Sequence, residues 1–190
     1  MGLNQGVGIG DRRQFLTSAG AATLGIGAVG LMSSRAVAAT AESGDLGVIQ
    51  TALALEHEGI AAYQIAGKSG LLSPDTLKLA LIFMGHHQEH RDSLARLVAD
   101  MGDRPVEPKS DVQYIADLKL ETLESEADVV ALATTLERGA ASAYIGQITS
   151  LQDPRVARLF ASISADEAVH WTTLNNAAGT PIPAAPYLFG

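Results

Sequence analysis

The chain has 190 residues, of which 47% are hydrophobic and 5% aromatic, and its formal net charge is −8 at pH 7. It contains no cysteine, which excludes disulfides, thiolate nucleophiles and cysteine-ligated metals, so any metal would be held by Glu, Asp and His. The acidic balance, with no basic stripe, argues against a nucleic-acid partner, and the alanine-rich composition predicts one mostly helical domain.

The first 38 residues resemble a twin-arginine export signal. Arg12 and Arg13 precede a weakly apolar run at 15–32, and small residues at 36–38 form a cleavage site. A transmembrane anchor is the alternative, but Gly, Ser and Thr dilute the run. We therefore predict a signal peptide at 1–38 and a periplasmic or secreted protein with no stable membrane anchor after cleavage.

Four long helical patterns follow in chain order. The second and fourth have clear beginnings, because Ser73-Pro74 and Asp153-Pro154 each place an N-cap residue before a proline at the first helical position. Gly102 and Gly179 are typical of helix ends. The predicted helices are 45–66, 74–101, 125–151 and 154 to about 179.

The connections between these helices are unequal. Tight turns join the first helix to the second and the third to the fourth, whereas 103–124 is a long crossover with a short helix at about 112–118. This pattern predicts an all-α, antiparallel four-helix bundle at 39–180, made of two helical hairpins. A proline-rich tail at 181–190 is predicted to be extended, lying over the bundle or over the neighbouring subunit of a homodimer.

An internal repeat relates the two hairpins. LEHEGIAAY in the first helix matches LERGAASAY in the third, and HQEHRDSL in the second matches EAVHWTTL in the fourth. The matched pairs are Glu56 with Glu137 and Tyr63 with Tyr144, both 81 residues apart, and His87 with Glu167 and His90 with His170, both 80 apart.

Helical periodicity places these polar residues on the inner faces. Steps of four and three residues trace one buried stripe on each helix. On the second helix the stripe is Phe83, His87, His90, Leu94, Leu97 and Met101, and on the fourth it is Val156, Phe160, Ile163, Glu167, His170 and Leu174. His86 is ambiguous, because it lies ~40° around the helix from His90.

This arrangement poses an electrostatic problem. Glu56, Glu137 and Glu167 would meet in an apolar interior, where each lone carboxylate costs several kcal/mol and the three repel one another. One or two bound cations would relieve that cost. The alternative is that the carboxylates pair with His90, His170 and buried waters, without metal.

These residues resemble the ferritin-like superfamily of di-metal carboxylate bundles, which includes the rubrerythrins and bacterioferritins. Its pattern is a Glu from each of two helices and Glu-x-x-His from each of the other two. Glu56 and Glu137 match the single glutamates, and Glu167 with His170 matches one Glu-x-x-His. His90 matches the histidine of the other motif, but His87 stands where its glutamate would be.

The resemblance implies a site that holds two iron ions, with Glu56, His87, His90, Glu137, Glu167 and His170 as ligands. A single Fe, Mn, Zn or Cu ion is the alternative, since His87 replaces a carboxylate. The implied function is an oxidoreductase acting on oxygen, peroxide or Fe²⁺ in oxidative or metal stress, with an external electron donor. The alternatives are a non-catalytic metal-binding or stress protein and an iron-storage cage.

Three further residues are candidates for supporting the ligands. Tyr63 and Tyr144 follow the single glutamates by two turns. Their hydroxyls either donate hydrogen bonds to the ligands, or act as redox-active phenols, or are simply satisfied in an aromatic core. His86, next to His87, is the third candidate.

Overall fold

The computed structural model describes residues 44–189, so the predicted signal peptide at 1–38 lies outside the described residues. Four long helices form the bundle: α1 (Asp45–Lys68), α2 (Pro74–Asp100), α4 (Glu126–Gln147) and α5 (Pro154–Ala177). The short helix α3 (Asp111–Leu118) and the 3₁₀ turns Leu120–Thr122 and Ile148–Ser150 complete the elements, and residues 44–189 contain no strand. The predicted all-α bundle of four long helices is confirmed.

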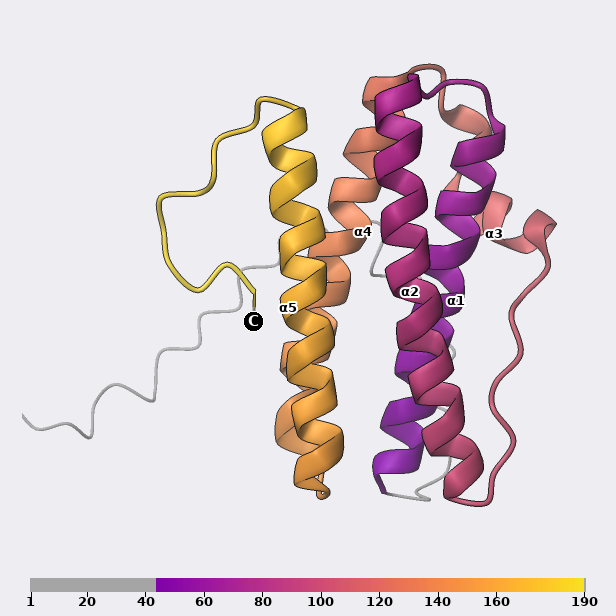
Figure 1. Ribbon diagram of the computed structural model, residues 1–190, viewed down its shortest axis with the longest axis vertical. Helices are drawn as coiled ribbons and strands as arrows, with labels where there is room; N and C mark the ends of the chain where they lie inside the picture. Colours follow the sequence, from indigo (N-terminus) through magenta and orange to yellow (C-terminus); the bar gives the residue numbers. More distant parts are fainter. Residues whose placement is uncertain (1–43, 190) are drawn as a thin grey trace, which may run out of the picture.

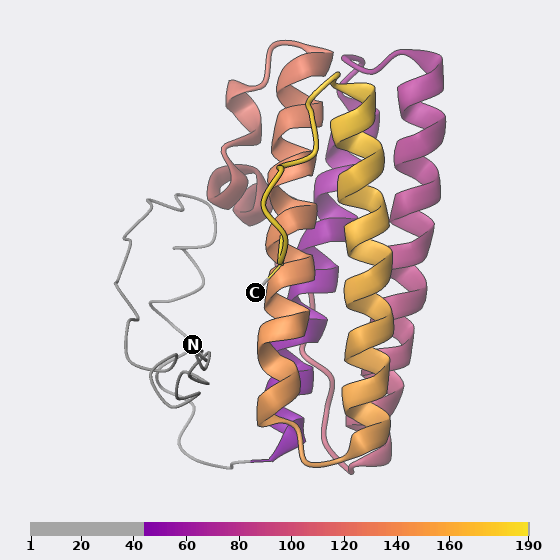
Figure 2. The same cartoon turned by 90° about the vertical axis from the view of Figure 1, so that its left-hand side faces the viewer.

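The long helices pair as two hairpins, α1 with α2 and α4 with α5 (Figure 1). The crossover between the hairpins runs along the outside of the bundle and carries α3, which contacts α1. After α5 the tail is not helical and turns back along the hairpin of α4 and α5 (Figure 2). Its Phe189 ring meets the buried Trp171 ring of α5, with ring centroids 5.2 Å apart.

Local signals start and stop these helices where the sequence predicts. The Ser73 hydroxyl accepts a hydrogen bond from the backbone N–H of Thr76, and the Asp153 carboxylate accepts one from Arg155. Gly102 and Gly179 adopt φ values of 84° and 65°, a left-handed conformation that ends a helix with little strain only at glycine.

Two acidic residues tie the hairpins together at opposite ends. Asp45, the first residue of α1, is buried and accepts hydrogen bonds of 2.7 Å from the backbone N–H groups of Gln152 and Asp153 in the α4–α5 turn. Glu126, the first residue of α4, accepts hydrogen bonds from Ser73 and Thr76 at the start of α2. Each carboxylate therefore satisfies polar groups at the turn of the other hairpin.

The apolar core consists of two clusters, one on each side of the bundle's polar middle. The larger includes Ile49, Leu53, Leu94, Val98, Tyr144, Val156, Phe160 and Ile163, and the smaller includes Tyr63, Ala80, Phe83 and Leu174. The predicted stripe of α5 is buried throughout. On α2 the prediction was wrong at the last two positions: Val98 is buried in place of Leu97, and Met101 is 49% exposed. Met101 is the C-cap of α2, where the helix leaves the core.

Among residues 44–189, no helix combines the length and the apolar character that crossing a membrane requires.

Candidate metal centre

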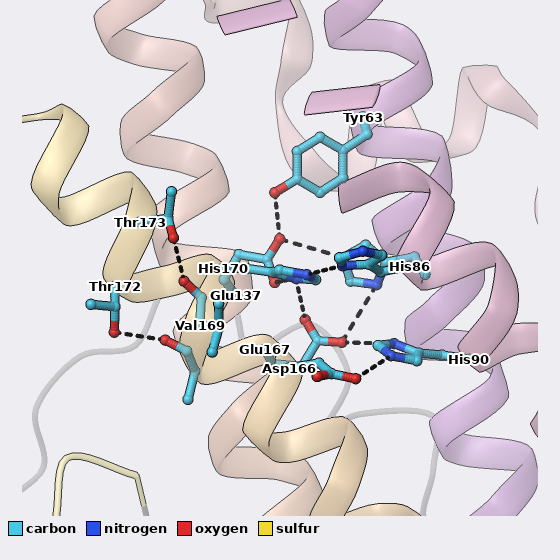
Figure 3. Close-up of polar contacts among 12 residues, drawn as sticks. Tyr63, His86, His90, Glu137, Asp166, Glu167, Val169, His170, Thr172 and Thr173 are labelled. Carbon is cyan, nitrogen blue, oxygen red and sulfur yellow. Dashed lines mark hydrogen bonds and ion pairs between the residues drawn. The ribbon is translucent and has the colours of Figure 1, made fainter. Parts of the chain in front are cut away.

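Six polar side chains from the four long helices are buried at mid-length of the bundle. They are Glu56 on α1, His87 and His90 on α2, Glu137 on α4, and Glu167 and His170 on α5. None is more than 8% exposed. Figure 3 shows His90, Glu137, Glu167 and His170 converging. The structure thus brings together all six predicted residues, and their role as metal ligands stays a prediction.

The first group of converging ligand atoms comprises Glu56, His87, His90 and Glu167. The Oε2 atom of Glu56 lies 2.8 Å from Nδ1 of His87 and 3.6 Å from Nδ1 of His90. The Oε1 atom of Glu167 lies 3.1 Å from Nδ1 of His90. This group offers two nitrogens and two oxygens to a cation.

The second group comprises His87, Glu137, Glu167 and His170. Nδ1 of His170 lies 3.3 Å from Oε2 of Glu137 and 3.2 Å from Oε2 of Glu167. Nε2 of His87 lies 3.4 Å from Oε1 of Glu137. This group also offers two nitrogens and two oxygens, and it shares His87 and Glu167 with the first group.

Two buried atoms in the first group have no hydrogen-bond partner, Nδ1 of His90 and Oε1 of Glu167. Unsatisfied buried polar atoms are rare in folded proteins, because each costs about 1–3 kcal/mol. Both atoms are metal-ligand types, and they lie 3.1 Å apart beside two further ligands. The residues therefore fit a bound cation, and the alternative in which carboxylates and histidines satisfy one another leaves these two atoms unpaired.

The outer nitrogens of two histidines are held from the opposite hairpin. Nε2 of His90 lies 3.2 Å from the Asp166 carboxylate on α5, and Nε2 of His170 lies 2.9 Å from Nδ1 of His86 on α2. Both contacts leave Nδ1 turned toward the centre, which is how metal-ligating histidines are usually oriented. His86 itself is exposed and belongs to neither ligand group.

The two tyrosines contact the single glutamates across the bundle. The Tyr63 hydroxyl on α1 donates to Glu137 on α4, and the Tyr144 hydroxyl on α4 donates to Glu56 on α1. Both rings are buried in the apolar clusters. Burial, followed by the charge of the neighbouring glutamate, raises the pKa of each tyrosine well above its ordinary value. These phenols are therefore core aromatics whose hydroxyls are satisfied by the candidate ligands themselves.

The surrounding histidines keep two of the three carboxylates ionised. Burial raises the pKa of Glu56, but its contacts with His87 and His90 outweigh that effect and lower the pKa to about 2. Burial likewise raises the pKa of Glu137, and contacts with His170 and His87 bring it well below its ordinary value. For Glu167 burial prevails and its pKa is raised.

The carboxylates have the reciprocal effect on the histidines. Burial lowers the pKa of His90, but contacts with Glu167 and Glu56 raise it to about 10. Burial is also the largest influence on His87 and His170, and in both the neighbouring carboxylates reverse it and raise the pKa. Without metal, protonated imidazoles thus neutralise the carboxylates, and a bound cation would replace those protons.

An apolar cavity of about 70 Å³ adjoins the centre. Glu56, Tyr63, His87 and Glu137 lie on its wall, and the rest of the lining is mostly aliphatic side chains of α1, α2, α4 and the end of the crossover. At roughly 30 Å³ per water in the liquid, this volume suits a small molecule rather than a bulky one.

Sequence reasoning missed Asp166 and Gly59. Asp166 contacts His90 and stands 80 residues after His86, the same spacing as the repeat, so the repeat itself held the signal. Gly59 faces the His87 ring, where a Cβ atom would lie 3.1 Å from two ring atoms. No local pattern marks this glycine, because its role depends on a contact between two helices.

Two antiparallel hairpins that enclose three carboxylates and three imidazoles define the class of four-helix proteins with a central metal-type donor cluster. The chain belongs to the ferritin-like domain family, whose model matches residues 44–180. This match confirms the ferritin-like resemblance drawn from the sequence.

Among solved structures, the chain is similar to a conserved hypothetical protein, rv2844, from Mycobacterium tuberculosis. The two chains are 25% identical and superpose with a TM-score of 0.63, covering 74% of this chain and 95% of the other. No curated protein matches the chain.

Proposed function

We propose that this chain is an exported ferritin-like metalloprotein that binds two metal ions, in the first instance iron, and acts as an oxidoreductase on oxygen, peroxide or Fe²⁺ during oxidative or metal stress. Electrons would come from Fe²⁺ itself or from an external donor. The periplasmic or secreted location rests on the twin-arginine resemblance at residues 1–38.

The observation that carries this proposal is the pair of unsatisfied buried atoms, His90 Nδ1 and Glu167 Oε1, beside two further ligand atoms. Two bound iron ions would supply one-electron chemistry and Lewis acidity at this position. The chain's own residues support the ions: Asp166 and His86 orient the outer histidines, and the tyrosine hydroxyls hold two of the carboxylates.

The neighbouring cavity supports a small substrate. Its wall reaches Glu56, His87 and Glu137, so a molecule inside it would meet the centre directly. Oxygen and peroxide fit a volume of about 70 Å³, and the aliphatic lining would keep bulk water away from the reacting atoms.

The test is elemental analysis of the protein purified from its own host, followed by absorbance measurements. About two irons per chain, together with an absorbance change on adding oxygen or peroxide to the reduced protein, would support the proposal. The Glu137→Gln variant should lose iron, whereas Glu89→Gln, an exposed change on α2, should not. Iron-free protein that neither binds nor oxidises Fe²⁺ would contradict it.

A second candidate is a non-catalytic protein that holds one Zn, Cu or Mn ion. The observation in its favour is that α2 carries His86 and His87 where α5 carries Asp166 and Glu167. Imidazoles in place of carboxylates suit these metals. One such ion per chain, with no response to oxygen or peroxide, would favour this candidate over the oxidoreductase.

A further inference from the structure

His87 is placed between the two groups of candidate ligands. Its Nδ1 lies 2.8 Å from Oε2 of Glu56 in the first group, and its Nε2 lies 3.4 Å from Oε1 of Glu137 in the second. The two nitrogens of one imidazole thus face different groups. Glu167 is shared in the same way, with Oε1 facing His90 and Oε2 facing His170.

The neighbouring helix leaves room for this ring. Gly59 lies one turn after Glu56 on α1, and a Cβ atom there would approach Cε1 and Nδ1 of His87 to 3.1 Å. Such a distance is tighter than nearly all real Cβ contacts. The imidazole is therefore packed against bare backbone, in an orientation that α1 would obstruct with any larger residue.

The repeat makes the substitution informative. Glu167, the counterpart of His87 in the other hairpin, offers one oxygen to each group. An imidazole at the corresponding position can also serve two ions, because its two nitrogens diverge. Without His87 each group would have one nitrogen and two oxygens, and with it each has two of both.

We propose that His87 bridges the two metal ions through its two ring nitrogens, so that the centre is joined by one imidazole and one carboxylate. This inference rests on the proposed function, because it requires that two ions bind. Both nitrogens can bind metal only when the ring has lost its N–H proton, so loading releases that proton to solvent. Three carboxylates and one imidazolate then balance the charge of two divalent ions.

The experiment uses Cu²⁺ as the probe. The metal is removed from the purified protein with a chelator, and the protein is then reloaded with two Cu²⁺ ions or with one Cu²⁺ and one Zn²⁺. A bridging imidazole couples the two copper spins, so the di-copper protein should show much less electron paramagnetic resonance intensity than two separate coppers. The mixed copper–zinc protein should recover the signal of one isolated copper.

Two variants assign the coupling to His87 rather than to Glu167. His87→Ala and Gly59→Ala should both restore the uncoupled copper signal, the first by removing the ring and the second by displacing it while every ligand stays in the chain. His57→Gln is the matched control, because this histidine on α1 contacts the Val106 carbonyl and belongs to neither group. It should leave the coupling unchanged.

The outcomes that overturn the bridge differ from those that overturn the proposed function. Two uncoupled coppers in the unaltered protein, or coupling that survives in both His87→Ala and Gly59→Ala, would exclude a His87 bridge while leaving a two-metal protein. Failure to bind two ions at all would remove both the bridge and the proposed function.

Discussion

The hydroxyl groups of Tyr63 and Tyr144 are the most direct link between the core and the candidate ligands. Each donates to a buried glutamate on the other hairpin. Removing the hydroxyl in Tyr63→Phe should destabilise the protein by about 1–3 kcal/mol, because the ionised Glu137 loses a buried donor. Urea unfolding measures this cost. Tyr187→Phe in the tail is the control, since Tyr187 is 94% exposed, and equal stability of the two variants would contradict the assignment.

Single residues also determine how the metal-free protein responds to pH. The pKa of His90 is raised from 6.5 to about 10, so its stabilising contribution is complete below pH 6.5 and is lost as the pH rises through about 10. The pKa of Glu56 is lowered from 4.5 to about 2, so its contribution is present above pH 4.5 and is lost as the pH falls through about 2.

The difference between the unaltered protein and His90→Gln isolates the first of these effects. Measured by urea unfolding in the presence of chelator, this difference should be constant at low pH and should shrink between pH 6.5 and about 10. A difference that stays the same up to pH 10 would mean that His90 is not protonated in the folded, metal-free protein.

At the scale of the helices, Asp45 joins the start of α1 to the α4–α5 turn. Asp45→Ala should cost about 2–4 kcal/mol of unfolding free energy, because the N–H groups of Gln152 and Asp153 lose their acceptor. Asp75→Ala is the matched control, since Asp75 lies exposed in the first turn of α2 and should contribute only a few tenths of a kcal/mol. Similar losses in both variants would show that Asp45 acts only through the helix dipole.

Local signals made the helices predictable, whereas contacts between helices were not. Ser73-Pro74 and Asp153-Pro154 start helices through their own backbone, and steps of three and four residues suffice to turn His87, His90, Glu167 and His170 inward. The partner of each inward residue is set by the pairing of hairpins far apart in sequence. The contact of His86 with His170 could not be foreseen for this reason, although the repeat hints at it.

The repeat extends further than the matched motifs first indicated. Asp45 and Glu126 are 81 residues apart, like Glu56 and Glu137, and each satisfies the turn of the opposite hairpin. The tyrosine–glutamate pairs cross the bundle in the same reciprocal way. The departures from this symmetry are concentrated on α2, at His86 and His87, and these positions are where the chain should differ chemically from a symmetric site.

For the whole molecule, the ligands come from all four long helices, so a bound ion would join both hairpins at mid-length. A ligand that binds only the folded state stabilises it by about 2.7–4.1 kcal/mol when its free concentration is 100–1,000 times Kd. For a domain of this size that corresponds to a rise in Tm of roughly 10 °C. Melting curves with chelator, with Fe²⁺ or Zn²⁺, and with Mg²⁺ as control should show this rise for the first two metals alone, since Mg²⁺ prefers a shell of oxygens. His90→Gln should reduce the rise, because it removes a ligand atom that has no other partner in the folded chain. Identical melting with chelator and with either transition metal would mean that the six buried residues stabilise the bundle by pairing with one another.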